Sequence, residues 1–198
     1  MKRYPVIVGI SGASGAILAE RTIERLLDLQ WPVEVLATPA ARIVWRQETL
    51  RQWADDVRRW QARGPFVEHS PNNQAASIAS GTYPVAGMII VPCSMGTVAS
   101  LAAGLATNLL LRAADVQQKE ARRLVVVPRE TPLAPVHLQN LLVLAQRGIR
   151  IVPPMPNFYK RPATLAEVVD FVAVRTLVAL GVMDELDDQQ QWQGLELE

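Results

Sequence analysis

Short, wholly apolar runs alternate with longer amphipathic stretches along this chain. The runs are rich in valine, isoleucine and leucine, which is typical of strands buried on both faces of a parallel sheet. Between them, apolar residues recur at helical spacing. Strands alternating with helices predict a doubly wound, Rossmann-like α/β sheet with helices on both faces. The expected strands are 6–9, 33–37, 88–91, 124–127 and 149–152, and the main helices are 98–120, 133–147 and 164–180.

The stretch 47–64 is strongly charged and carries Trp53 and Trp60, with Trp45 just before it. The three tryptophans are about two helical turns apart. This spacing puts the three rings roughly on one face of a helix. We expect an amphipathic helix packed against the body of the domain, with contact to a partner protein as the alternative.

The last helix has a start signal of its own. Thr164 and Glu167 form a capping-box pattern just after Pro162. The expected apolar stripe is Leu165, Val168, Val169, Val172 and Thr176. Arg175 lies at the edge of this stripe, and an arginine there either snorkels toward water or faces an anion.

Length and charge fit one ordinary globular domain. The chain has 198 residues, of which 49% are hydrophobic and 20% charged, and a net charge of +1. We expect a single domain over 1–181 and a C-terminal tail over 182–198. The balanced charge argues against nucleic-acid binding. The apolar start of the chain is too short for a membrane span and lacks the cleavage region of a signal peptide, so we expect no membrane association and a cytoplasmic location.

A glycine-rich turn follows the first strand, with Gly9, Gly12 and Gly15 at three-residue spacing before a helix. Such a turn lets a phosphate approach the unpaired amides of the helix N-terminus. The spacing differs from the dinucleotide pattern, and the second strand ends near Thr38 rather than at a ribose-binding acid. A mononucleotide therefore fits better than a dinucleotide, although a purely structural turn is nearly as well supported.

Three further clusters follow later strands, where open α/β sheets bind ligands. Residues 92–97 (PCSMGT) collect hydroxyls and free amides, and we expect Cys93 to be a buried, inert thiol rather than a nucleophile. Arg129 and Glu130 follow the strand 124–127, downstream of Arg112 and Lys119. Residues 153–162 form a stiff, proline-rich loop with Phe158 and Tyr159, which either connects elements or closes over a ligand.

Charged and titratable residues outside these clusters suggest no other chemistry. Arg122 and Arg123 are expected to be solvated charges at a helix end, and an ion pair with Asp115 is the structural alternative for Arg112. The two histidines, His69 and His137, lack metal-ligand spacing, so no metal site is expected.

These four clusters, in this order, resemble the UbiX/Pad flavin prenyltransferase family. The resemblance covers nearly the whole chain and weakens over 48–75, and Lys160 stands where the family has histidine. The matching stretches are GISGASGA (9–16), ASIASG (76–81), PCSMGT (92–97), LLRAADVQQKE (110–120), VPRETPL (127–133) and PMPNFYKRP (154–162).

The resemblance implies a flavodoxin-like fold assembled as a homododecamer, with FMN near a subunit interface. It also implies a metal-independent enzyme that joins a dimethylallyl group from dimethylallyl (mono)phosphate to N5 and C6 of reduced FMN. The product, prenylated FMN, then serves as the cofactor of a UbiD-type decarboxylase.

Site residues carried over by this resemblance fall into three sets. The flavin would be held by Gly12, Ala13, Ser14, Thr38, Ser94, Met95, Gly96, Thr97 and Arg129. The allylic phosphate would be held by Arg112, Lys119, Arg129, Tyr159 and Arg175, with Trp192 in a tail that closes over the site. Glu130, Ser14 and Lys119 would take part in the reaction, and Glu130 is a candidate for acid–base work.

Two alternative functions remain open at this stage. An FMN-dependent cysteine decarboxylase shares the fold, but such enzymes use an active-site histidine and a PASANT-like segment where this chain has PCSMGT. A non-catalytic flavin carrier or accessory subunit of a decarboxylase is the other alternative. The chain keeps the polar residues that the resemblance assigns to the reaction, which argues against a non-catalytic carrier. These residues are Lys119, Arg129, Glu130, Tyr159 and Arg175.

Overall fold

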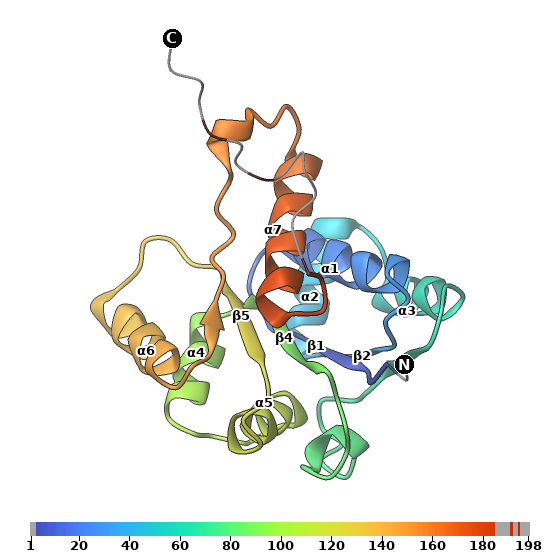
Figure 1. The fold of residues 1–198 in the computed structure, drawn as a ribbon. Helices are drawn as coiled ribbons and strands as arrows, with labels where there is room; N and C mark the ends of the chain where they lie inside the picture. The colour runs from blue at the N-terminus through green and yellow to red at the C-terminus, as the bar shows by residue number, and fades with distance from the viewer. Residues whose placement is uncertain (1–2, 185–190, 192–193, 195–198) are drawn as a thin grey trace.

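The computed structural model describes residues 3–184, 191 and 194, and shows a six-stranded parallel sheet of order β3-β2-β1-β4-β5-β6 (Figure 1). The strands are β1 (Val6–Ile10), β2 (Val33–Ala37), β3 (Phe66–Glu68), β4 (Gly87–Cys93), β5 (Leu124–Pro128) and β6 (Arg150–Ile151). The α-helices are α1 (Ala16–Asp28), α2 (Pro39–Thr49), α3 (Trp53–Gln61), α4 (Met95–Ala102), α5 (Leu109–Lys119), α6 (Pro135–Gln146) and α7 (Leu165–Leu180). Two short 3-10 helices are η1 (Ser77–Ala79) and η2 (Phe158–Lys160).

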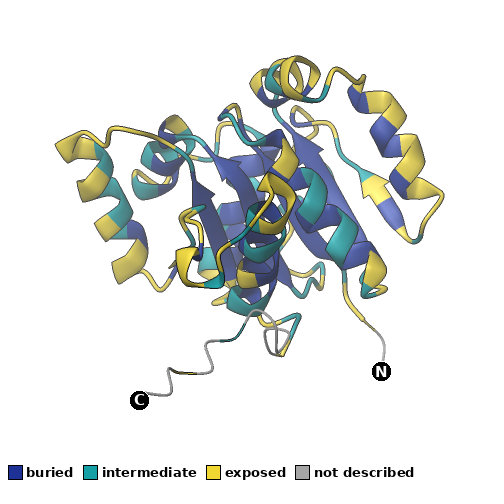
Figure 2. Ribbon diagram, turned by 90° about the horizontal axis from the view of Figure 1, so that it is seen from above, coloured by how far each residue is buried: buried dark blue, intermediate teal, exposed yellow. Residues whose placement is uncertain are grey.

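Two apolar cores lie on opposite faces of the sheet. Successive strand residues point to opposite faces, so Val6 and Val8 join one core while Ile7 joins the other. The first core is covered by α1, α2, α3 and α7, and the second by η1, α4, α5 and α6. Figure 2 shows the buried strands at the centre with exposed helix surfaces outside them. The predicted doubly wound α/β fold is confirmed.

The strand predictions hold and the helix predictions need two corrections. All five expected strands are present, but β6 is reduced to Arg150–Ile151. The predicted helix 98–120 is wrong, because residues 103–108 separate α4 from α5. Gly104 adopts a positive φ of 71° there, and the Asn108 side chain accepts a hydrogen bond from Leu111 N to cap α5.

The charged stretch 47–64 also divides, into the end of α2 and the whole of α3. Leu50, at φ 58°, ends α2 in the left-handed conformation. The rings of Trp45, Trp53 and Trp60 meet edge to face with centroids 5.1 to 5.7 Å apart, all buried. The expected packing against the body is therefore confirmed.

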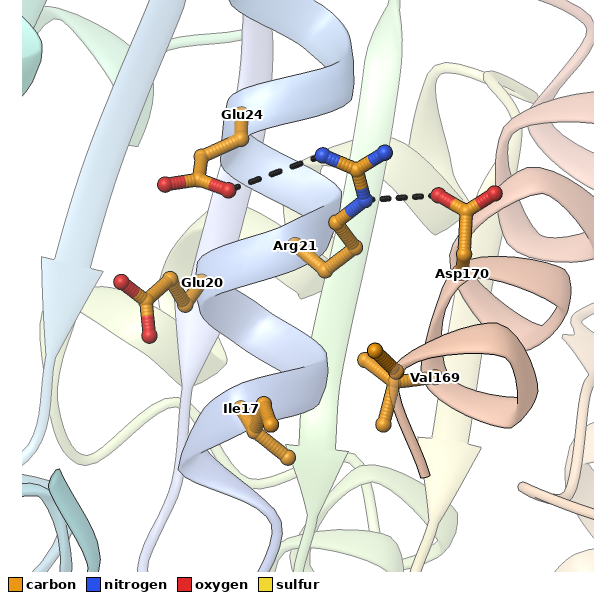
Figure 3. A pocket seen from close by; sticks show the side chains of 7 residues that line it. Ile17, Glu20, Arg21, Glu24, Val169 and Asp170 are labelled. Atoms are coloured by element: carbon orange, nitrogen blue, oxygen red, sulfur yellow. Dashed lines mark hydrogen bonds and ion pairs between the residues drawn. The ribbon is translucent and has the colours of Figure 1, made fainter. Parts of the chain in front are cut away.

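α7 is fixed to α1 by charge as well as by apolar contact. Arg21 Nε lies 2.6 Å from Asp170 Oδ1 and Arg25 Nη2 lies 2.5 Å from Asp170 Oδ2. Figure 3 shows Arg21 between Glu24 and Asp170, with Ile17 and Val169 beside them. These residues line a hollow of about 270 Å³ between α1 and α7, and each of its charged groups has an ion-pair partner.

The start of α7 follows its predicted capping box. The Thr164 hydroxyl oxygen accepts from Glu167 N at 3.3 Å, and a Glu167 carboxylate oxygen accepts from Ala163 N at 2.9 Å. The expected stripe is correct at Val169, Val172 and Thr176, which are buried, but not at Leu165, which is 68% exposed. In the part of the chain that the structure describes, no helix is long and apolar enough to cross a bilayer.

Candidate active site

A pocket of about 310 Å³ opens at the carboxyl edge of the sheet, where the strands end. We call it the carboxyl-edge pocket, and it brings together residues from the turns after β1, β2 and β4 and from the segment before α5. Its lining includes Gly12, Thr38, Ser94, Gly96, Thr97 and Asn108. The structure thus gathers five of the predicted flavin-binding residues around one hollow.

Three helices begin at this pocket, each with a polar cap residue in its wall. Thr38 Oγ1 accepts from Ala41 N at 3.2 Å and Ser94 Oγ accepts from Thr97 N at 3.3 Å. Asn108 Oδ1 accepts from Leu111 N at 3.0 Å. A helix N-terminus presents unpaired amides and a positive dipole end, so α2, α4 and α5 together favour an anion such as a phosphate.

Ser11 joins the two turns that form the floor of this pocket. Its hydroxyl donates to the carbonyl of Pro92 at 3.0 Å, and its oxygen accepts from Ser94 N at 2.7 Å. This contact fixes the glycine turn after β1 against the turn after β4. Ser11 was not among the site residues predicted from the sequence.

Gly12 is needed where the glycine turn approaches α2. A Cβ at Gly12 would lie 2.5 Å from Ala40 Cβ, whereas a Cβ at Gly96 in the same pocket would meet nothing within 4 Å. We expect Gly12→Ala to lower the free energy of unfolding by about 1–3 kcal/mol, because the turn must move away from α2. Urea unfolding measures the change.

Gly96→Ala is the matched control for that substitution. It adds the same methyl group to the same pocket, but into open space, and we expect a change of less than about 0.5 kcal/mol. Equal losses in the two variants would show that the approach of Gly12 to Ala40 is not the cause.

The N-terminus of α1 differs from the sequence prediction. We expected its amides to face a phosphate, but Glu48 at the end of α2 already caps them. The carboxylate accepts from Gly15 N at 2.9 Å and from Ala16 N at 2.7 Å. Glu48 lies 33 positions from the turn in sequence, so no local pattern could have identified it.

Glu48 is held in its charged form beside two predicted site residues. Partial burial opposes its ionisation, but a hydrogen bond with Ser14, the amides of Ala16 and Gly15, and the charge of Arg129 outweigh burial and lower its pKa. Ser14, Glu48 and Arg129 thus form one polar cluster at the start of α1.

Arg129 connects this cluster to Glu130. Its backbone amide donates to the carbonyl of Cys93 at 3.1 Å, and its Nε donates to the carbonyl of Ser14 at 3.1 Å. Glu130 Oε1 accepts from Thr131 N at 3.0 Å. Arg129 and Glu130 line a second, mostly apolar pocket of about 300 Å³ with Leu133, Leu141, Pro153, Pro154 and Met155.

Cys93 lies between the two pockets but is shielded from both. Its side chain is fully buried, and this burial raises the pKa of the thiol far above its ordinary value. The prediction of an inert thiol is confirmed. Within residues 3–184, 191 and 194, no three His, Cys, Asp or Glu side chains gather as metal ligands.

Met95 and Ala13 contact the rest of the site differently from the polar residues. Their side chains are 6% and 8% exposed and belong to the protein interior. Met95 is the first residue of α4, so its backbone amide, and not its thioether, is what it offers to a ligand in the pocket.

The predicted phosphate-binding residues Arg112 and Lys119 lie in the first turn and at the last residue of α5. α5 runs about 16 Å from the carboxyl-edge pocket toward the edge of the sheet where the strands begin. Arg112 Nη1 pairs with Asp115 at 2.6 Å, as the structural alternative predicted, and Lys119 pairs with Glu120. In the described part of the chain, no hydrogen bond or ion pair joins either side chain to Ser14 or Arg129.

Tyr159 and Arg175 are also on exposed surfaces. Tyr159 is 48% exposed in η2, on an arm that projects with the first turns of α7 beyond the sheet (Figure 1). Arg175 is exposed on α7. Trp192 and most of the predicted tail fall outside the described residues.

The comparisons with known proteins agree with this geometry. A family model described as Flavoprotein matches residues 1–178. The flavin prenyltransferase UbiX of Synechocystis sp. is 44% identical, with 96% of each chain covered. The flavin prenyltransferase UbiX of Chlamydia pneumoniae is 42% identical, with 99% of this chain and 100% of the relative covered.

Solved structures give the same result. A dodecameric FMN-dependent UbiX-like decarboxylase from Escherichia coli O157:H7 matches with TM-score 0.87 and 40% identity, covering 96% of this chain and all of that one. AnUbiX (PadA1), in complex with FMN and dimethylallyl pyrophosphate, matches with TM-score 0.88 and 34% identity over 98% of this chain and all of that one. The chain therefore belongs to the UbiX family of flavin prenyltransferases, among the flavoproteins.

Proposed function

We propose that this protein is a flavin prenyltransferase that joins a dimethylallyl group from dimethylallyl (mono)phosphate to N5 and C6 of reduced FMN. Its product, prenylated FMN, passes to a UbiD-type decarboxylase. The observation that carries the proposal is the carboxyl-edge pocket, with three helix N-termini around it and Arg129–Glu130 beside it. A cytoplasmic location is part of the proposal, and cell fractionation tests it.

The FMN phosphate fits the carboxyl-edge pocket because its wall supplies hydroxyl groups at the N-termini of α2 and α4. Thr38, Ser94 and Thr97 present these groups, and Gly12 and Gly96 let the backbone approach closely. Ser14 and Arg129 would hold the isoalloxazine ring. Bound there in its reduced form, FMN supplies the nucleophilic N5 and C6 atoms.

Arg129 and Glu130 have different tasks in this arrangement. Arg129 is held by Ser14 and Cys93 carbonyls, so its charge is fixed in place to stabilise the phosphate that leaves the allylic carbon. Glu130 faces the adjoining apolar pocket and is placed to accept or return a proton as the second bond forms. The apolar wall, including Leu133 and Met155, suits the dimethylallyl chain.

Neighbouring copies complete the phosphate site. Arg112 and Lys119 pair with carboxylates of their own chain, and Arg175 is exposed on α7. We infer that these three cations bind the donor phosphate in the site of an adjacent subunit. The E. coli structural neighbour is dodecameric, and we propose the same homododecamer here.

Exposed apolar side chains support this assembly. α6 and the arm leave large hydrophobic groups at the surface of one chain, and burying them between subunits is favourable. These side chains are Leu133, Val136, Leu138, Leu142, Met155 and Phe158, each between 41% and 77% exposed.

Anaerobic incubation with reduced FMN and dimethylallyl phosphate tests the function. We expect mass spectrometry of the extracted flavin to show FMN heavier by one prenyl unit. Flavin that binds but leaves unmodified would favour a carrier, and it would contradict the proposed reaction. Omitting the protein gives the background.

A further inference from the structure

A buried carboxylate on β2 has a partner set that the proposed reaction does not use. The Glu34 side chain is 6% exposed, although a charge in this position is costly without hydrogen bonds. Its two oxygens accept from the Tyr83 hydroxyl at 2.5 Å and contact His69 Nε2 at 2.7 Å. The carboxylate therefore holds two residues of the long segment between β3 and β4.

Tyr83 is held at both of its ends. While Glu34 binds the hydroxyl, the Arg122 guanidinium donates to the carbonyl of Tyr83 at 2.9 Å and to that of Gly81 at 2.5 Å. Arg122 is thus not the solvated helix-end charge that the sequence predicted. The segment 77–83, which includes η1, is anchored to β2 on one side and to the end of α5 on the other. We call it the anchored loop.

The anchored loop contacts both cations of α5 that the proposed function assigns to the donor phosphate. The carbonyl of Ala79 accepts from Arg112 Nε at 3.1 Å. Asp115 accepts a hydrogen bond from Nη1 of the same guanidinium, so two of the three Arg112 nitrogens have fixed partners. At Gly81, a Cβ would lie 2.6 Å from Lys119 Nζ, so the loop backbone passes directly against the Lys119 ammonium.

We propose that Tyr83 and Glu34 are positioning residues for the donor phosphate, because they fix the loop that orients Arg112 and Lys119. This inference rests on the proposed function, in which those two cations bind the allylic phosphate. Tyr83 and Glu34 themselves touch neither substrate. They act by holding the cationic side chains ready, so that less conformational freedom is lost when the phosphate binds.

The chemistry of the pair suits a permanent anchor. The hydrogen bond to Glu34, burial and the negative charge of Glu34 raise the pKa of Tyr83, so its hydroxyl stays protonated and remains a donor. Glu34 keeps His69 as a partner when the Tyr83 hydroxyl is removed. Tyr83→Phe is therefore a mild change that should leave the fold intact.

The test compares the affinity of FMN-loaded protein for dimethylallyl phosphate, measured by calorimetry, with turnover. For Tyr83→Phe we expect the dissociation constant and the KM for dimethylallyl phosphate to rise about tenfold, as fits the loss of a hydrogen bond to a charged group. We expect FMN affinity and kcat to stay within about twofold of wild type, because no residue of the anchored loop lines the carboxyl-edge pocket or the pocket of Glu130.

Thr82→Val is the matched control. It removes a hydroxyl from the next residue of the loop, one that is bonded only locally to Ser80, and should leave all four constants unchanged. Glu34→Gln keeps an oxygen acceptor for Tyr83 and should stay closer to wild type than Tyr83→Phe. Arg122→Gln removes the other anchor and should reproduce the loss of phosphate affinity.

Unchanged phosphate affinity in both Tyr83→Phe and Arg122→Gln would overturn the inference, as would an equal loss in Thr82→Val. A lower melting temperature with unchanged affinity would also overturn it, since that is the signature of a purely structural role. Wild-type protein that binds the phosphate but forms no prenylated flavin would refute the proposed reaction instead. In that case the role of Tyr83 is still decided by the dissociation constant for dimethylallyl phosphate in Tyr83→Phe compared with that in wild type.

Discussion

Glu130→Gln is expected to bind FMN as tightly as wild type and to slow formation of prenylated FMN by about a hundredfold or more. An amide keeps the size of the side chain and the oxygen that accepts from Thr131 N, so the loop after β5 should not move. What it loses is the ability to take up and return a proton. The flavin dissociation constant and the single-turnover rate, followed by mass spectrometry, separate these two effects.

Glu24→Gln is the control for this substitution. It makes the same chemical change on α1, in the hollow between α1 and α7, and should leave the rate within about twofold of wild type. Prenylated FMN formed at the wild-type rate by Glu130→Gln would remove Glu130 from the mechanism.

Asp56→Ala is expected to lower the free energy of unfolding by about 2–3 kcal/mol. The Asp56 side chain is only 2% exposed and lies among cations and an indole. It accepts from Trp45 Nε1 at 2.8 Å and pairs with Arg51 at 3.0 Å and Arg59 at 2.9 Å. Truncation leaves a buried indole N–H without its acceptor. It also removes one carboxylate from Arg51 and Arg59, which both keep Glu20 as a partner.

Asp55→Ala measures the same truncation at an exposed position. Asp55 is 57% exposed and pairs with Arg58 one turn along the helix, an arrangement that contributes little in water. We expect a loss below about 0.5 kcal/mol in urea unfolding. Similar losses in the two variants would mean that the tryptophan cluster does not depend on its buried carboxylate.

The apolar pattern predicted most of the sheet because parallel strands that are buried on both faces are apolar along their whole length. β3 was not predicted, because it is a short edge strand in which Val67 is 48% exposed and Glu68 is polar. The break between α4 and α5 was not predicted, because Leu105 and Ala106 continue the apolar pattern through it. In that segment the glycine and asparagine signals were outweighed by periodicity.

The candidate site was predictable where it is local. Cap residues such as Thr38 and Ser94 come directly after strands, so their position and residue type together identified them as candidate ligand-binding residues. Glu48 could not be found in this way, because its contact with the start of α1 arises only from tertiary folding. The family resemblance named Lys119 and Arg175 as site residues, but one protomer does not bring them to Ser14.

That separation means that the proposed site can be divided between different polypeptides. A Ser14→Ala subunit would still carry an intact Lys119, and a Lys119→Ala subunit would still carry an intact Ser14. Coexpressed in one mixed assembly, two variants that are each inactive would regenerate some complete sites at their junctions. Intragenic complementation of this kind follows from a site whose halves lie at opposite edges of one sheet.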